Sequence, residues 1–326
     1  MNILVTGGAG FIGSCFVRHI LEKYKDYKII NIDALTYAGN IENLDDIKDN
    51  PNYKFVHGNI CDKKLVRELM HQVDCVVNFA AESHVDRSIT GPEIFIETNV
   101  QGTLNLLQSA KEANIQRYLQ VSTDEVYGSL GKTGYFYETT PIAPNSPYSA
   151  SKASADLLVR AYYETYKMPV LNTRCSNNYG PYQYPEKLIP FFISKLLKGQ
   201  KVPVYGDGLN VRDWLYVYDH CSAIDTVLHN GKVGEIYNIG GHNEKTNLEI
   251  TKLILNAMGK DESSIEYVQD RLGHDRRYAI SNDKIQSELG WEPSLTFEEG
   301  IKITIDWYLN NQSWIKSIED KKAGAL

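Results

Sequence analysis

The sequence predicts an α/β protein: a doubly wound parallel sheet with a smaller, interleaved α/β second domain. Short runs rich in Val and Ile alternate, in the first half, with segments of 3.6-residue periodicity. These runs are almost continuously apolar, which is typical of parallel strands covered by helices on both faces. The length of 326 residues suits about two domains.

The expected elements follow in chain order. Strands are predicted within 2–7, 28–33, 53–59, 74–81 and 117–123, and helices within 13–24, 103–113 and 146–166. From about Met168 the pattern loosens, with strands within 168–175 and 202–208, a helix within 298–311 and a polar tail at 317–326. No low-complexity linker separates the halves. We therefore expect one domain at 1–176, a second mainly at 177–326, and a segment near 211–240 that returns to the first.

Composition narrows the class of protein. There are 34 basic and 41 acidic side chains, a formal net charge of −7, which argues against a nucleic-acid or membrane-surface binder. No signal peptide and no apolar run of the ~18 residues that a membrane span needs is seen. The cysteines are dispersed without a CxxC spacing, so reduced thiols, no metal site and a cytoplasmic location are expected. They are Cys15, Cys61, Cys75, Cys175 and Cys221.

A glycine-rich loop, "LVTGGAGFIGS", joins the first strand to the first helix. Gly8, Gly10 and Gly13 form a G-x-G-x-x-G frame, which allows a tight turn and close backbone approach to a pyrophosphate. The alternative is an ordinary strand–helix turn. Asp33 ends the second strand, where a carboxylate accepts hydrogen bonds from ribose hydroxyls and repels a 2′-phosphate. A Rossmann-type site for NAD, in preference to NADP, is therefore predicted.

Tyr148 and Lys152 lie four residues apart at the start of a helix, so both side chains point to one face. A nearby ammonium favours phenolate and is expected to lower the tyrosine pKa from its ordinary value near 10. The pair could remove a hydroxyl proton during hydride transfer. With 22 tyrosines in the chain, a chance pair on a solvated helix is the alternative.

Two adjacent acids, Asp124 and Glu125, follow a strand in "VSTDEVYG". Ligands of open α/β sheets bind at the carboxyl ends of the strands. An elimination needs one carboxylate to accept a proton and one carboxylic acid to donate one. Two carboxyl groups packed together and partly desolvated resist double ionisation, so one can stay protonated. The alternative is that the acids cap the following turn.

These motifs and their order resemble the extended short-chain dehydrogenase/reductase superfamily. Further segments resemble its dTDP-glucose 4,6-dehydratases over most of the chain: "IDALTYAGN", "AAESHVDRSITGP", "STDEVYG", "NNYGPYQYPEKLIP", "GLNVRDWLYV" and "DRLGHDRRYAI". The resemblance implies a hydro-lyase with tightly bound NAD that converts dTDP-glucose to dTDP-4-keto-6-deoxyglucose and water. The steps would be C4 oxidation, C5/C6 elimination and hydride return to C6. The implied setting is deoxysugar biosynthesis, of the rhamnose type, for cell-surface polysaccharide.

The resemblance also implies catalytic roles. Tyr148, assisted by Lys152, would remove the proton of the 4-hydroxyl while Thr123 hydrogen-bonds the 4-oxygen. Glu125 would remove the C5 proton and Asp124 would protonate the departing 6-hydroxyl.

Positions implied to contact NAD are Gly7, Gly10, Phe11, Ile12, Gly13, Asp33, Ala34, Leu35, Thr36, Asn59, Ile60, Ala80, Ala81, Ser83, Thr98, Tyr148, Lys152 and Asn178. Positions implied to contact the nucleotide sugar are Ser83, His84, Thr123, Asn177, Glu186, Lys187, Leu188, Pro203, Tyr205, Arg212, Asn247, Arg271, His274 and Tyr278. Two positions depart from the family pattern: Leu272 replaces a usual proline, and Asn59 replaces a usual aspartate.

Three alternatives stay open. A nucleotide-sugar 4-epimerase would share the oxidation but normally lacks the two acids. A 4,6-dehydratase of another nucleotide sugar would differ only in the base. A non-catalytic NAD-binding regulatory protein would have no use for Thr123, Tyr148 and Lys152 together. The resemblance further implies a homodimer through the helix that carries Tyr148, with Leu157, Leu158 and Ala161 as candidate contacts.

Overall fold

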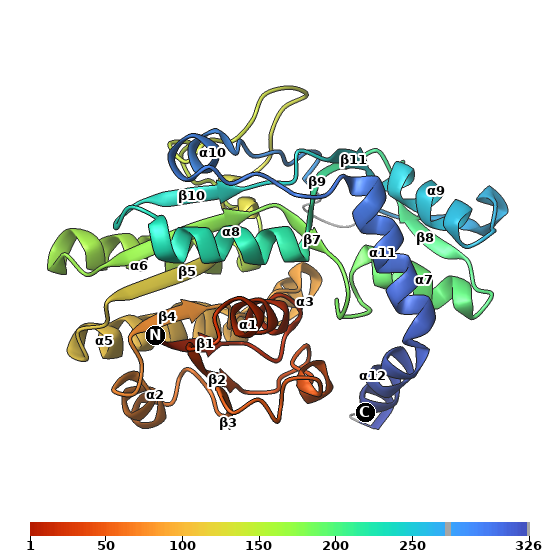
Figure 1. Ribbon diagram of the computed structural model, residues 1–326. Coiled ribbons are helices and arrows are strands. Elements are labelled where there is room, and N and C mark those ends of the chain that lie inside the picture. The colour runs from red at the N-terminus through yellow and green to blue at the C-terminus, as the bar shows by residue number, and fades with distance from the viewer. Residues whose placement is uncertain (271–274, 325–326) are drawn as a thin grey trace.

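The structure, a computed structural model, describes residues 1–270 and 275–324. Its main layer is a seven-stranded parallel sheet in the order β10-β6-β5-β4-β1-β2-β3 (Figure 1). The strands are β1 (Asn2–Thr6), β2 (Lys28–Asp33), β3 (Tyr53–His57), β4 (Cys75–Asn78), β5 (Arg117–Thr123), β6 (Val170–Cys175) and β10 (Ile236–Ile239). The predicted fold class and the strands expected in the first half are confirmed.

Helices cover both faces of this sheet. One face carries α1 (Phe11–Lys23) and α8 (Val217–Asn230), and the other carries α2 (Lys63–Met70), α5 (Thr103–Glu112) and α6 (Pro147–Tyr166). The side chains of β1 alternate between the two cores: Ile3 and Val5 pack with α1, and Leu4 packs with α5. This alternation explains why the strand has to be apolar throughout.

The second part of the molecule has two small sheets, β11-β9-β7 and β12-β8, covered by helices with their own apolar core. Its strands are β7 (Asn177–Tyr179), β8 (Val202–Tyr205), β9 (Val211–Tyr216), β11 (Glu244–Thr246) and β12 (Ile265–Val268). Its helices are α7 (Leu188–Leu197), α9 (Asn247–Ala257), α11 (Phe297–Asn310) and α12 (Gln312–Gly324). Within the described residues no helix is both long and apolar enough to cross a membrane.

Short helical segments complete the description. They are η1 (Ile41–Leu44), α3 (Val85–Thr90), α4 (Glu93–Phe95), the π-helix η2 (Ile96–Gly102), η3 (Asp124–Tyr127), η4 (Glu262–Ser264) and α10 (Asp283–Leu289).

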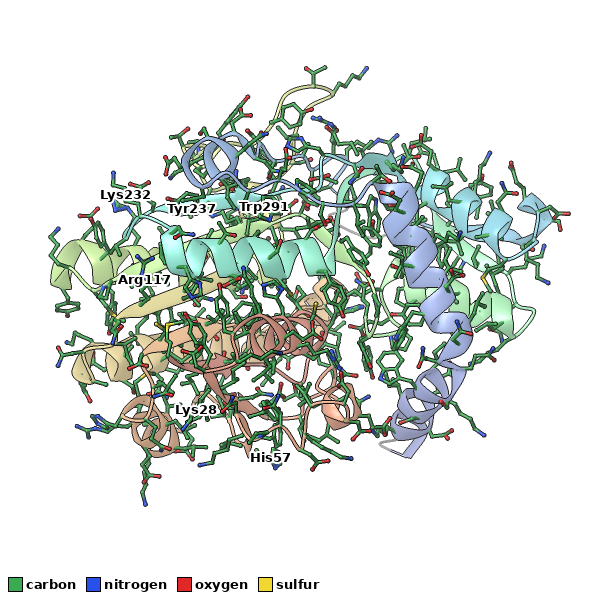
Figure 2. All side chains as sticks on the ribbon, in the orientation of Figure 1. Lys28, His57, Arg117, Lys232, Tyr237 and Trp291 are labelled. Carbon is green, nitrogen blue, oxygen red and sulfur yellow. The ribbon has the colours of Figure 1, made fainter. Side chains whose placement is uncertain are left out.

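The chain returns to the large sheet twice. Helix α8 and strand β10, from the segment expected to return, lie with the large sheet, whereas β9 lies in a small one. The second return, α10, was not predicted. The Tyr237 hydroxyl of β10 donates to Glu288 of α10 at 2.9 Å, and the Trp291 indole donates to Ser222 of α8 at 2.9 Å (Figure 2).

The polar tail predicted at 317–326 is wrong, because α12 runs through most of it. Three apolar side chains of this helix, Trp314, Ile315 and Ile318, are buried in the core of the second part. The exposed positions between them dominate the composition and hide this narrow stripe.

A buried carboxylate, Asp225 of α8, joins α8 to α1. Its side chain is 1% exposed and lies 3.0 Å from His19 Nε2, 2.7 Å from Lys23 Nζ and 2.9 Å from His229 Nδ1. Burial alone would raise the pKa of Asp225, but the hydrogen bonds from His19, His229 and Lys23 outweigh it and lower that pKa. The hydrogen bond with Asp225 raises the pKa of His229.

Asp225→Asn is expected to lower the free energy of unfolding by about 3 kcal/mol, because it removes a buried charge and leaves the donors of His19, Lys23 and His229 without their charged acceptor. The lowered pKa of Asp225 stabilises the fold above the ordinary aspartate value near 4, and the raised pKa of His229 stabilises it below about 6.5. In urea unfolding, Asp225→Asn should therefore lose more free energy of unfolding near pH 5.5 than at about pH 8. Asp45→Asn, at an exposed pair 3.2 Å from Lys48, should change stability by less than about 0.5 kcal/mol.

Candidate active site

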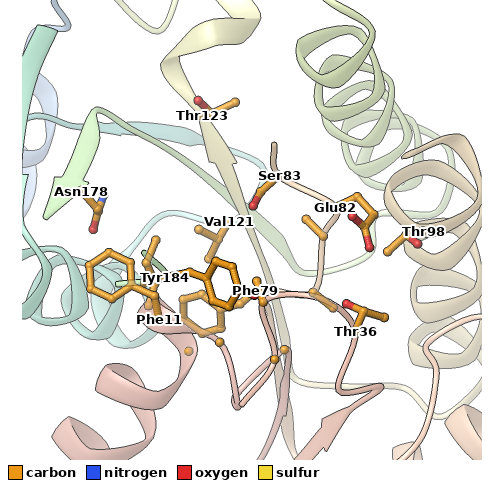
Figure 3. A pocket seen from close by; sticks show the side chains of 18 of the residues that line it. Phe11, Thr36, Phe79, Glu82, Ser83, Thr98, Val121, Thr123, Asn178 and Tyr184 are labelled. Carbon is orange, nitrogen blue, oxygen red and sulfur yellow. The ribbon is translucent and has the colours of Figure 1, made fainter. Parts of the chain in front are cut away.

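A cavity of about 310 Å³ opens where the strands of the large sheet end. Because the strands are parallel, their carboxyl ends lie at one edge of the sheet, and the sequence motifs that follow these ends meet there. The predicted residues that line it are Gly7, Gly10, Phe11, Ile12, Gly13, Asp33, Ala34, Thr36, Asn59, Ile60, Ala80, Ala81, Ser83, Thr98, Thr123, Asp124, Glu125, Tyr148, Lys152, Asn177, Asn178, Glu186 and Lys187. Figure 3 shows Thr36 and Thr98 on one side of the pocket and Phe11 with Tyr184 on the other.

The glycine loop faces the cavity through Gly7, Gly10 and Gly13, whereas Gly8, the first glycine of the predicted frame, does not line it. Gly7 has a φ of +72°, and a Cβ there would lie 2.7 Å from the backbone nitrogen of Ala80. Gly8 instead turns toward Asn31, whose side chain accepts a hydrogen bond from the Gly8 N–H at 3.0 Å. The Gly7 backbone therefore lies directly against the residues that follow β4, where a side chain would not fit.

Asp33, at the end of β2, is buried and held by two backbone donors. The N–H groups of Ala9 and Leu35 each donate to its carboxylate at 2.8 Å. Burial raises the pKa of Asp33, and these two hydrogen bonds oppose that rise. Leu35, which was expected to line the cofactor site, is not part of the cavity wall; its contribution is this backbone hydrogen bond.

These residues fit a dinucleotide. The glycine loop gives a backbone cradle before the helix α1, whose first N–H groups can bind phosphate. Several buried polar atoms on the cavity wall have no hydrogen-bond partner in the described part of the chain, namely Ser122 Oγ, Asp124 Oδ2, Gln183 Oε1 and Glu186 Oε1. Buried polar atoms without partners are rare in folded proteins, so they indicate a polar ligand.

The acid pair begins the turn η3. Thr123 caps this turn, since its hydroxyl accepts a hydrogen bond from the Glu125 N–H at 3.2 Å. The acids are therefore not needed as caps. Asp124 is only 2% exposed, and burial, then Glu125 and Asp213, raise its pKa well above the ordinary value. Asp124 can thus stay protonated near neutral pH, which suits a proton donor.

Tyr148 and Lys152 both lie on the cavity wall, 8% and 5% exposed. The prediction that Lys152 lowers the pKa of Tyr148 is wrong. Burial, followed by Glu125, raises the pKa of Tyr148 well above its ordinary value, and burial lowers the pKa of Lys152. The Lys152 ammonium donates to the Val121 carbonyl at 2.7 Å.

A buried ion pair connects the helix of Tyr148 to the turn of the acid pair. Asp156, one turn after Lys152, accepts from Arg174 of β6 at 2.9 Å, and both side chains are under 5% exposed. The Arg174 guanidinium lies 4.7 Å from the centre of the Tyr127 ring in η3. The Tyr127 hydroxyl in turn donates to Asn238 of β10 at 2.8 Å. The helix that carries Tyr148 and the turn η3 are therefore held in a fixed relation.

Some predicted substrate contacts are not part of the cavity wall. These are His84, Leu188, Pro203, Tyr205, Arg212, Asn247 and Tyr278, while Arg271 and His274, like the departure at Leu272, fall outside the described residues. Arg212 is buried with its guanidinium 4.5 Å from the Tyr278 ring centre, and it partly opposes the raised pKa of Asp124. It therefore lies close enough to the acid pair to act on its charge.

The cavity wall also contains residues that the sequence argument missed, among them Tyr37, Glu82, Cys175, Gln183 and Tyr184. Cys175 could have been found, because it ends a parallel strand beside Thr123. The Tyr37 hydroxyl lies 3.1 Å from Ser83 Oγ, and Tyr37 gave no signal of its own in the sequence.

Comparison with known proteins agrees with this geometry. A family model described as GDP-mannose 4,6 dehydratase matches residues 4–304. The dTDP-glucose 4,6-dehydratase of Xanthomonas campestris pv. campestris is 56% identical over 97% of this chain and 95% of its own length. The structure of UDP-glucose 4-epimerase from Thermotoga maritima has a TM-score of 0.89 but is 31% identical, over 96% of this chain and 100% of its own.

Two solved dehydratases are more similar. The dTDP-glucose 4,6-dehydratase of Bacillus anthracis, in complex with NAD, is 58% identical with a TM-score of 0.92, over 98% of this chain and 99% of its own. The dTDP-glucose 4,6-dehydratase of Streptomyces venezuelae, also with NAD bound, is 52% identical with a TM-score of 0.95. The match covers 98% of this chain and 100% of its own. The chain therefore belongs to the dTDP-glucose 4,6-dehydratase family, within the extended short-chain dehydrogenase/reductase superfamily.

Proposed function

We propose that the protein is an NAD-dependent hydro-lyase that converts dTDP-glucose to dTDP-4-keto-6-deoxyglucose and water. The observation that carries this proposal is the acid pair Asp124–Glu125 on the wall of the same cavity as Tyr148 and Lys152. A tyrosine and lysine suffice to oxidise a sugar, whereas a pair of carboxyl groups, one to donate a proton and one to accept one, adds the means to eliminate water. The proposed family setting is deoxysugar biosynthesis.

The first step is oxidation at C4. Bound NAD would supply the hydride acceptor and a fixed positive charge in the pocket. Tyr148 takes the proton of the 4-hydroxyl, and Lys152 stabilises the phenolate. Thr123 donates a hydrogen bond to the 4-oxygen. Burial raises the pKa of Tyr148, and the positive charge of bound NAD would oppose that rise.

The second step is elimination across C5 and C6. The C4 ketone acidifies the C5 proton, which the Glu125 carboxylate removes. Asp124 gives its proton to the 6-hydroxyl, which leaves as water as the C5–C6 double bond forms. Hydride then returns to C6, and Glu125 returns a proton to C5. Over the cycle the proton gained by Tyr148 balances the proton lost by Asp124, so the substrate loses one water and nothing else.

The remaining wall residues support the assignment of binding roles. We propose that Asp33 accepts from the adenosine ribose, and that Asn59, Thr98 and Asn178 contact NAD at other points of the wall. Asn177, Glu186 and Lys187 are proposed to bind the sugar side, with Arg212 near the diphosphate, where a guanidinium can bind two oxygens at once. The cofactor unit is proposed to comprise 1–176 together with the returning segments α8, β10 and α10.

The test uses purified protein and dTDP-glucose in deuterated water, without added cofactor. The expected product is a 4-keto-6-deoxy sugar that carries solvent deuterium at C5 and the original C4 hydrogen at C6. Recovery of dTDP-galactose without a keto product would instead identify a 4-epimerase. A panel of dTDP-, UDP-, CDP- and GDP-glucose in the same assay identifies the base.

The protein is further proposed to be a homodimer, because apolar side chains lie exposed along α4, η2 and α6. Leu157, on the helix that carries Tyr148, is 55% exposed, and Ile96 and Ile94, in the neighbouring η2 and α4, are 53% and 43% exposed. Leu157→Asp is expected to shift the mass measured by light scattering from dimer to monomer. The same substitution at Leu209, 45% exposed in the second part, should leave the mass unchanged.

A cytoplasmic location is proposed because all five cysteines are unpaired thiols.

A further inference from the structure

The last helix of the chain lies against a segment that continues from the cofactor site (Figure 1). Residues 34–39 follow Asp33, and most of them line the cavity. They continue into residues 40–46, here called the anchor segment, which contains η1. Nothing in the chemistry proposed above uses α12 or the anchor segment, so their contact needs another explanation.

The anchor segment is bound to the glycine loop. The Asn40 N–H donates to the Ala9 carbonyl at 3.0 Å, and the Asn43 side chain donates to the same carbonyl at 2.9 Å. Arg18 of α1 donates to the Asn43 carbonyl and forms an ion pair with Asp46 at 2.6 Å. Asn40 and Asn43 are 4% and 1% exposed, so the bonds that they make are shielded from water. Any movement of the anchor segment must therefore disturb the phosphate-binding loop.

Helix α12 holds the outer side of the anchor segment. The Trp314 indole N–H donates to Asn43 Oδ1 at 2.9 Å. The Ser317 hydroxyl donates to the Glu42 carboxylate at 2.7 Å, and the Lys321 ammonium donates to it at 2.8 Å. The hydrogen bonds from Lys321 and Ser317 lower the pKa of Glu42, so the carboxylate is charged at neutral pH. Lys321 also donates to Asn40 Oδ1 at 2.8 Å.

A segment that continues into the opposite wall of the cavity also contacts Arg18 and Trp314. The Tyr182 ring lies 4.4 Å from the Arg18 guanidinium and 5.8 Å from the Trp314 ring. The next residues, Gln183 and Tyr184, line the cavity. One cluster therefore joins the glycine loop, the wall after Asp33 and the wall after Tyr182.

We propose that Trp314, Ser317 and Lys321 are positioning residues that keep NAD in its site by holding the anchor segment against the glycine loop. The inference rests on the proposed function, in which the cofactor ends each cycle in the oxidation state in which it began. Release between cycles serves no purpose in such a reaction, and a contact that slows release keeps the enzyme active. The residues act on the cofactor through Asn43 and Ala9, without touching it themselves.

The test measures how fast the holoenzyme releases NAD. Released NAD is captured by excess alcohol dehydrogenase and ethanol, and the resulting absorbance of reduced nicotinamide is followed with time. The double variant Ser317→Ala/Lys321→Ala is expected to release NAD about tenfold faster, because it removes hydrogen bonds to a charged carboxylate. Lys316→Ala is the matched control, since it removes the same charge from the exposed face of α12 and should leave the rate unchanged.

Salt separates a positioning role from a general loss of stability. Release from the parent should accelerate with KCl, which screens the partly exposed Lys321–Glu42 pair, whereas release from the double variant should not. Trp314→Phe, which keeps the ring and loses the N–H, is expected to release NAD several-fold faster should the double variant fold poorly. An unchanged release rate in these variants would overturn this inference and leave the proposed function intact. A parent protein that yields no NAD on denaturation would refute the proposed cofactor and this inference with it.

Discussion

Glu125→Gln is expected to oxidise the sugar at C4 and to stop there. The amide fills the same space but cannot accept the C5 proton, so the rate of 4-keto-6-deoxy product formation should fall about 10²–10⁴-fold. Oxidation depends on Tyr148 and should persist, so reduced nicotinamide absorbance should accumulate on the protein. Deuterium should no longer enter C5. Glu68→Gln, an exposed residue of α2, is the matched control and should behave as the parent.

Asp124→Asn separates the two acids. It removes the proton donor but leaves Glu125, so C5 should still exchange with solvent while water is no longer lost. If both variants lost C5 exchange and dehydration together, the division of roles between the two acids would be contradicted. A Glu125→Gln variant that forms product at the parent rate would refute the assignment of Glu125 as the base.

Stability gives an independent readout of Asp124. Its pKa is raised in the folded protein, so the fold binds a proton more tightly than the unfolded chain does. The folded state therefore loses stability as the pH rises above the ordinary aspartate pKa of about 4, until the raised pKa is passed. Asp124→Asn removes this loss. The variant should exceed the parent in free energy of unfolding, by a difference that grows with pH over that range. A difference that shrinks with rising pH would contradict the raised pKa.

Tyr148→Phe is expected to abolish all three steps, because no group remains to take the 4-hydroxyl proton. The rate should fall about 10²–10⁴-fold, without accumulation of reduced nicotinamide. The missing absorbance distinguishes this variant from Glu125→Gln. Tyr162→Phe is a matched control on the same helix, since the Tyr162 hydroxyl donates to Gln108 at 3.0 Å and does not line the cavity. Rapid reduction of NAD by Tyr148→Phe would show that another group is the base.

Local pattern was sufficient to predict strands β1 to β6 of the large sheet. Strands β1 and β4 are mostly apolar because helices cover both faces, so their composition reports their own burial. The same logic fails for β10, whose place in the sheet depends on pairing with β6, a strand far away in the sequence. It also fails for α12, where a narrow apolar stripe is buried only because of the helices around it.

The sequence predicted those residues of the candidate site that lie at the ends of individual strands. The order of Asp33, Thr123 and Cys175 along one sheet edge follows from the parallel topology, although Cys175 was overlooked. The spacing of Tyr148 and Lys152 predicted a shared helix face but not the partner of Lys152, because the Val121 carbonyl belongs to a distant strand. The choice between Gly7 and Gly8 likewise depends on contacts with Ala80 and Asn31, which no local pattern contains.

The two returns of the chain to the large sheet have a mechanical consequence. Helix α8, which packs on the large sheet, follows β9 of a small sheet, and α10 follows β12, so several separate connections cross between the two parts. A hinge needs a few residues that absorb the whole rotation. Here one rotation would have to bend every crossing at once. Sugar nucleotide should therefore enter and leave by movement of individual loops, with the two halves of the pocket kept at constant separation.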